Sequence, residues 1–166
     1  MTLSPRPRRS TPLLLPVGLA ALLVLTGCSF SIGGGGEASG GDGADTSVLE
    51  LKVGDCLNDS QDDGTVNDVP VVDCAEPHDS EVFAVFDAEA TGDTMPGEDE
   101  LTAQANNGCD AAFTEFIGVP YTDSAYSYAS YTPTLSSWYE EGGQAITCVA
   151  FDPAGPTTGS LEGVAE

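Results

Sequence analysis

Four cysteines in the middle and end of the chain constrain its fold more than any other sequence feature. Cys56, Cys74, Cys109 and Cys148 allow three sets of two disulfides. Order along the sequence favours Cys56–Cys74 and Cys109–Cys148, each bond stabilising the fold by roughly 3–4 kcal/mol. Zinc is the alternative, but no pair has the two-residue spacing of zinc knuckles. We therefore expect two disulfides and no metal or other cofactor.

Acidic side chains greatly outnumber basic ones. Of 166 residues, 27 are Asp or Glu and 4 are Lys or Arg, three of them being Arg6, Arg8 and Arg9. Beyond residue 27 the chain holds all 27 acids and one base, Lys52, a formal charge of −26. A surface of this sign repels phosphate backbones, so nucleic acid is excluded as a partner.

The first 27 residues have the pattern of a lipoprotein signal peptide. Three arginines precede an apolar run at residues 13–25, which contains Pro16 and is shorter than the roughly 20 residues of a spanning helix. Residues 25–28, Leu-Thr-Gly-Cys, resemble the lipobox of bacterial lipoprotein precursors, which makes Cys28 the lipidated residue. Two acyl chains there predict anchoring on the extracytoplasmic face of the cell membrane. An uncleaved membrane anchor is the alternative.

Three further segments follow the predicted cleavage point. Residues 28–47 are rich in glycine and small polar residues, which predicts a flexible tether. Residues 48–152 have a length common for one compact domain. Residues 153–166 again contain mostly small residues, glycine and proline, and we predict a disordered tail.

Hydrophobic periodicity predicts an α+β domain, with an antiparallel sheet and one main helix packed across it. A helix is expected over residues 96–117, with acids at 98–100 in its first turn and Gly118 ending it. Strands are expected at residues 48–53, 69–72, 80–88, 126–131 and 144–151. Pro70 suggests a strand edge or start, and residues 58–68 read as a polar loop. The strand at 80–88 is apolar on both faces, with Val82, Ala84 and Phe86 on one and Phe83 and Val85 on the other, which predicts a central position.

Several short motifs occur along the predicted domain. They are Gly54-Asp55-Cys56, the pattern C-x-x-P-H-x-x-E-V over residues 74–82, Cys109 within the predicted helix, and Trp138 ten residues before Cys148. Together these motifs resemble the septum formation family domain. The resemblance covers residues 48 to about 151. It implies an extracytoplasmic domain linked to septum formation, and no established chemistry comes with it. The basic residue that often follows the tryptophan is missing from Tyr-Glu-Glu-Gly-Gly-Gln at residues 139–144.

His78, the only histidine, lies in the sequence Pro77-His78-Asp79-Ser80-Glu81. One interpretation makes it a base or metal ligand beside Asp79 and Glu81. The other makes residues 77–79 a turn whose imidazole and carboxylate bond to backbone groups. We favour the turn and expect no catalytic residue, because the sequence contains no nucleophile frame such as G-x-S-x-G.

Two other patterns suggest binding. Residues 59–67 follow an EF-hand loop up to the ninth position, but the twelfth, which should be Glu, is Pro70. We assign no metal ligand there and keep a weak calcium site as an alternative. Aromatic residues gather at Tyr121, Tyr126, Tyr128, Tyr131, Trp138 and Tyr139. Of these, Tyr126, Tyr128, Trp138 and Tyr139 are the expected partner contact.

Taken together, the sequence predicts a lipid-anchored, non-enzymatic interaction module of the bacterial cell envelope. Its expected partners are the membrane, through Cys28, and an envelope or division protein. A solute- or glycan-binding lipoprotein is the first alternative. A hydrolase centred on His78 is the second.

Overall fold

The computed structural model describes residues 43–59 and 64–165. The predicted signal peptide, the lipid on Cys28 and the predicted tether as far as residue 42 lie outside the described residues. No helix in the described part is long and apolar enough to cross a membrane.

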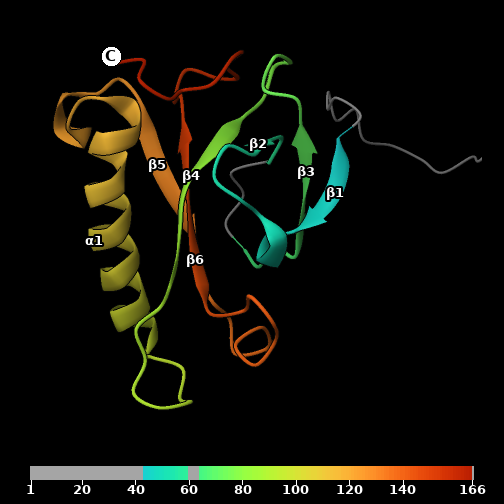
Figure 1. Cartoon of the computed structure of the whole chain (residues 1–166), viewed down its shortest axis with the longest axis vertical. Helices are drawn as coiled ribbons and strands as arrows, with labels where there is room; N and C mark the ends of the chain where they lie inside the picture. The colour runs from blue at the N-terminus through green and yellow to red at the C-terminus, as the bar shows by residue number, and fades with distance from the viewer. Residues whose placement is uncertain (1–42, 60–63, 166) are drawn as a thin grey trace, which may run out of the picture. The chain divides into compact units, whose positions relative to one another are not determined.

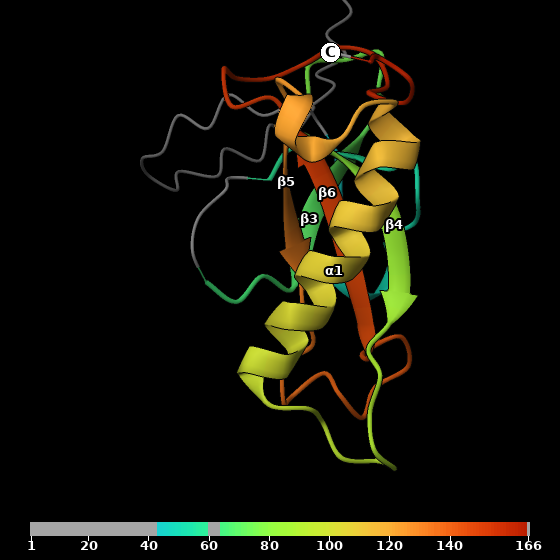
Figure 2. The ribbon, with the colours of Figure 1, turned by 90° about the vertical axis from the view of Figure 1, so that its left-hand side faces the viewer.

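Within the described residues, the domain is one six-stranded antiparallel sheet with a single long helix against it (Figure 1). The strands are β1 Ala44–Ser47, β2 Cys56–Leu57, β3 Asp68–Val72, β4 Ser80–Asp87, β5 Ser127–Tyr131 and β6 Ala145–Phe151, in the order β1-β3-β2-β4-β6-β5. The helix α1, Glu98–Ile117, packs across β4, β5 and β6 (Figure 2). Two short 3-10 helices are η1 Val48–Glu50 and η2 Tyr121–Asp123. The predicted α+β class is confirmed.

Helix α1 follows its sequence signals. Its buried stripe repeats every fourth residue, at Leu101, Ala105, Cys109, Phe113 and Ile117. Three acids lie in the first turn, where the helix dipole favours negative charge. Gly118 ends the helix with φ of 98°, a conformation that suits glycine, and its N–H donates to the Thr114 carbonyl.

The predicted strand at residues 48–53 is wrong. The strand on the outer side of β3 is instead β1, which lies in the segment assigned to the tether, so the tether ends before Ala44. Local hydrogen bonds explain why the chain turns after β1. The Ser47 hydroxyl accepts the Leu49 N–H at 3.4 Å, and the Asp55 carboxylate accepts the Lys52 N–H at 2.8 Å. Side-chain bonds of this kind compete with strand pairing.

Strand β3 is not at the sheet edge, although it contains Pro70 at its centre. The Pro70 carbonyl accepts the Asn58 N–H, at 3.0 Å, just beyond the end of β2 at Leu57. Because N–H and C=O of one strand residue point to the same side, the missing Pro70 donor faces the point where β2 has ended. Because β2 is only two residues long, it has no residue opposite the Pro70 nitrogen, and proline is tolerated in β3.

Strand β4 is central, as predicted, but a β-bulge changes its faces. Val82 pairs with Val149 and Ala84 with Cys148, so Phe83 is an extra residue between them. Phe83 consequently packs in the core beneath α1 together with Ala84 and Phe86, while Val82 joins the core on the opposite face. Strict alternation, which placed Phe83 beside Val85, is wrong for this strand.

The two expected disulfides are confirmed. Cys109–Cys148 joins α1 to β6, with 5.7 Å between the Cα atoms and both residues fully buried. Cys56–Cys74 joins β2 to the turn after β3, with 5.3 Å between the Cα atoms. The Glu81 carboxylate lies near the Cys56 and Cys74 sulfurs, but these sulfurs are bonded to each other. No thiolate pair is left there for zinc.

Candidate functional site

The sequence Pro-His-Asp-Ser-Glu at residues 77–81 forms the turn that leads from Cys74 into β4. The Asp79 N–H donates to the Leu57 carbonyl at 2.8 Å, which aligns the turn with β2. The His78 backbone exchanges two hydrogen bonds with Thr157, each 2.9 Å long. The turn thus contacts a segment 79 residues further along the chain.

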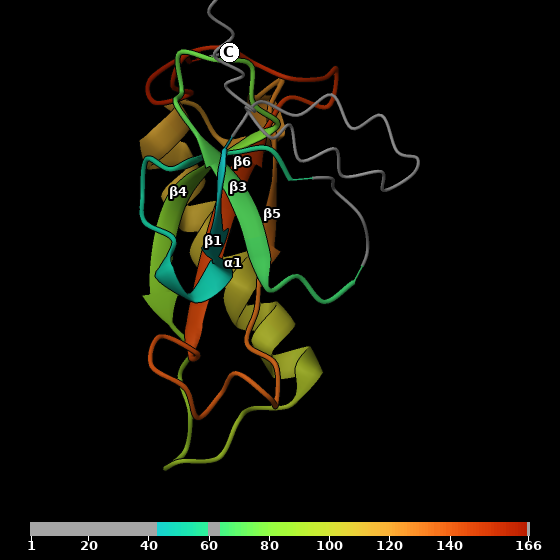
Figure 3. The same cartoon turned by 90° about the vertical axis from the view of Figure 1, so that its right-hand side faces the viewer.

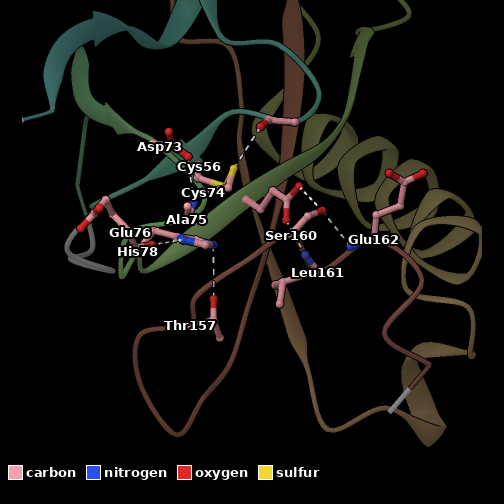
Figure 4. Close-up of a disulfide and its surroundings, with 12 residues drawn as sticks. Cys56, Asp73, Cys74, Ala75, Glu76, His78, Thr157, Ser160, Leu161 and Glu162 are labelled. Atoms are coloured by element: carbon pink, nitrogen blue, oxygen red, sulfur yellow. Dashed lines mark hydrogen bonds between the residues drawn. A yellow bond between two sulfur atoms is a disulfide. The ribbon is translucent and has the colours of Figure 1, made fainter.

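The His78 ring is fully buried and both its nitrogens have partners (Figure 4). Nδ1 lies 2.9 Å from the Glu76 carbonyl oxygen, which can only accept, so Nδ1 carries the hydrogen. Nε2 lies 3.3 Å from the Thr157 hydroxyl, which is its hydrogen-bond partner. This geometry agrees with the interpretation of His78 as a turn residue, because neither nitrogen reaches a substrate while Thr157 is in place.

Glu81, 2% exposed, binds the C-terminal part of the chain with both carboxylate oxygens. Oε1 accepts the Ser160 hydroxyl at 2.8 Å, and Oε2 accepts the Leu161 N–H at 2.6 Å (Figure 4). Hydrogen bonds to an ionised carboxylate are stronger than those between neutral groups, and they offset the desolvation of a buried charge. The Leu161 side chain then packs into the core beneath α1.

Residues 157–165, here called the C-terminal segment, are therefore ordered, and the predicted disordered tail is wrong. Besides its bonds to His78 and Glu81, this segment donates from Gly159 N–H to the Cys74 carbonyl at 2.6 Å. Gly163 and Ala165 donate to the last carbonyls of α1, on Phe116 and Ile117. Glycine-rich composition suggested disorder, but the segment supplies donors that a buried carboxylate and an open helix end require. Glu81 within an apolar strand was the sequence signal for such a partner.

Asp59, 7% exposed, links three parts of the domain. Oδ1 accepts the Ser80 hydroxyl at 2.7 Å, and Oδ2 accepts the Tyr131 hydroxyl from β5. Burial, together with the bond to Asp59, raises the pKa of the Tyr131 phenol, which therefore stays protonated and donates. Burial and the nearby Asp59 charge also raise the pKa of the Asp79 carboxyl, while His78 opposes the rise. Residues 60–63 of the EF-hand-like loop lie outside the described residues, and a weak calcium site there stays an untested alternative.

Trp138 is not a surface contact, and its prediction as one is wrong. It is 1% exposed, packs in the core beneath α1, and donates from Nε1 to the Asp93 carbonyl at 3.2 Å. Tyr126 and Tyr128 are half-buried, and the Tyr128 ring lies 4.9 Å from that of Tyr121. Among the predicted contacts, Tyr139 is the exposed one, at 73%.

The loop that buries Trp138 depends on a glycine. A Cβ on Gly143 would overlap the Ser137 backbone carbonyl, and backbone cannot move aside cheaply. Gly143→Ala is expected to lower the free energy of unfolding by about 2 kcal/mol, measured by urea denaturation. Gly64→Ala is the control, because a Cβ there meets nothing within 4 Å. Equal effects of the two changes would contradict this account of the loop.

A second feature is a groove of about 520 Å³, here called the polar groove. Its lining includes Tyr131 of β5 and Thr147 of β6, which lie opposite each other on the sheet face away from α1. Figure 3 shows the ribbon from that side, with α1 behind the sheet. One wall comes from residues 47–49 and 64–68, and the other from residues 130–137. The groove could not be predicted from sequence patterns, because it is assembled from separate segments with no shared motif.

Comparison with known proteins identifies the family to which this domain belongs. Fold and site define a small α+β domain, stapled by two disulfides, whose buried His78 and Glu81 hold its own C-terminal segment. No curated protein and no solved structure matches the chain. A family model described as "Septum formation" matches residues 40–149, more than half of the sequence. The chain therefore belongs to the septum formation family, which links it to that process.

Proposed function

We propose that this protein is a lipid-anchored, non-enzymatic interaction module on the outer face of the cell membrane, where it binds a protein of the envelope or division apparatus. Family membership supports the link to septum formation. The Leu-Thr-Gly-Cys sequence ending at Cys28 supports the anchor. The two disulfides fit an oxidising compartment outside the cytoplasm.

The non-enzymatic part of the proposal rests on one observation: the side chains that could act in catalysis are bonded within the protein. His78, Glu81 and Asp59 are all buried, and each bonds through its side chain to other parts of its own chain. A general base must reach a proton of the substrate, and these groups instead fix the turn, the C-terminal segment and β5. Their arrangement favours a rigid body that presents a surface.

The surface that best fits a protein partner is the loop between β5 and β6. Leu135 is 72% exposed and Tyr139 is 73% exposed, the two highest values among the large apolar side chains of the described residues. Large apolar and aromatic side chains held outward on a loop are typical anchors of protein interfaces. We therefore move the expected contact from Trp138 to its two exposed neighbours.

The test is crosslinking in native cells followed by mass spectrometry of the purified protein. Leu135→Ser with Tyr139→Ser is expected to lose at least about tenfold in capture of discrete division or wall-synthesis proteins. Val53→Ser, at a site 59% exposed outside this loop, is the matched control and should capture normally. Equal capture by both variants would remove this loop from the proposal.

Separately, Cys28→Ser is expected to move the protein from the membrane fraction to the soluble fraction, and unchanged fractionation would contradict the lipid anchor.

A further inference from the structure

The polar groove has the size and position of a ligand site. Its volume of about 520 Å³ falls in the range of roughly 300–1,000 Å³ typical of small-molecule pockets. It opens on the face of β5 and β6 that α1 leaves free, between η1 and the start of β3 on one side and residues 130–137 on the other. We propose that this groove binds an uncharged saccharide, a function beyond the capture of a protein partner.

Hydroxyl groups dominate the groove lining. Ser47 and Thr65 lie on one wall, and Thr132, Thr134 and Ser137 lie on the other. Each hydroxyl can donate one hydrogen bond and accept two, which matches the donor and acceptor character of sugar hydroxyls. A lining of this kind recognises polyhydroxyl ligands better than purely apolar ones.

Part of this lining is already fixed in position. The Ser137 hydroxyl accepts the Thr134 N–H at 3.0 Å, and the Thr134 hydroxyl accepts the Ser137 N–H at 3.2 Å. Tyr131 is held by the bond from its hydroxyl to Asp59. A site whose groups are held before binding loses less conformational entropy when the ligand enters.

Apolar atoms in the groove fit the other side of a sugar. Val48, Val66 and the half-buried Tyr131 contribute to the lining. The C–H faces of a pyranose ring are apolar and are buried well against such side chains, above all aromatic ones. The groove thus combines both kinds of surface that a saccharide presents.

The charge of the groove lining favours neutral saccharides over anionic ones. Among the described residues that line the groove there is no lysine or arginine, while Asp68 and Glu140 are present. Lys52, the only base after residue 9, lies outside the lining. Carboxylated or phosphorylated polymers are therefore repelled, and the expected ligand is neutral. The competing ligand is a cationic peptide, which the same carboxylates would attract.

The probe is a neutral oligomer of N-acetylglucosamine, titrated into the full-length protein and followed by calorimetry. Saturable binding is expected with a Kd below about 1 mM. Oligogalacturonate, an anionic saccharide, is expected not to bind. Thr65→Ala combined with Thr132→Ala, both exposed positions in the groove, should weaken binding about tenfold. Thr102→Ala, an exposed hydroxyl on α1, is the control and should bind normally.

Three results would overturn the proposal. One is the absence of saturable binding up to about 10 mM of the oligomer. Another is equal weakening, or none, in the groove and control variants when circular dichroism shows both folded. The third is tighter binding of oligolysine than of the saccharide. Each leaves the crosslinking test of Leu135 and Tyr139 unaffected, so the two proposals fail separately.

Discussion

Glu81→Ala is expected to lower the free energy of unfolding by about 3 kcal/mol, one of the largest effects of any single substitution in this domain. The change removes both acceptors from the C-terminal segment and leaves the Leu161 N–H, bonded at 2.6 Å in the wild type, without its partner. It also leaves a space in a strand position that is 2% exposed. Urea denaturation measures the loss, and hydrogen exchange at the Leu161 amide should accelerate.

Glu81→Gln is the matched variant. Its amide oxygen can still accept the Leu161 N–H, and its NH₂ group can donate to the Ser160 hydroxyl, which also accepts. We expect a loss of only about 1 kcal/mol and a Leu161 amide that stays protected. Deleting residues 157–166 should cost less in the alanine variant than in the wild type, because the shared hydrogen bonds are already gone. Additive losses would contradict the role given to Glu81.

Removing the Cys109–Cys148 disulfide is expected to have the other large effect. Its cysteines are 39 residues apart, and loop-closure entropy predicts a loss of about 4 kcal/mol when both become alanine. For Cys56–Cys74, with a separation of 18, the same reasoning predicts about 3 kcal/mol.

Thermal and urea unfolding of the two double-alanine variants measure this order. The first variant should also lose near-ultraviolet circular dichroism, because Cys109 and Cys148 lie in the same core as Phe83, Phe113 and Trp138. A larger loss for Cys56→Ala with Cys74→Ala would contradict the order that loop length predicts.

The hydrophobic periodicity of the sequence predicted the helix and strands whose apolar pattern lies within their own residues. The four-residue stripe of α1 and the apolar character of β4 and β6 are local properties, and both survive in the fold. The disulfide pairs followed from sequence order once these elements were known. Of the candidate site, the turn at His78 could be predicted, because proline and aspartate favour such turns.

Features that depend on distant contacts could not be predicted. The bulge at Phe83 is visible only from the register between β4 and β6. The burial of Trp138 depends on a loop that returns to Asp93, 45 residues away. The C-terminal segment has a composition typical of disorder, and its order comes from Glu81, 80 residues earlier. The secondary-structure propensity of a segment does not indicate which distant residues it will contact.

The distance in sequence between Glu81 and Leu161 affects when the domain can become complete. A chain that emerges N-terminus first, from a ribosome or from a translocation channel, exposes Glu81 about 80 residues before its backbone donor appears. Until then, moving the carboxylate out of water is unfavourable, and the core beneath α1 lacks the Leu161 side chain. The domain therefore reaches its final packing only after residues 157–165 have emerged.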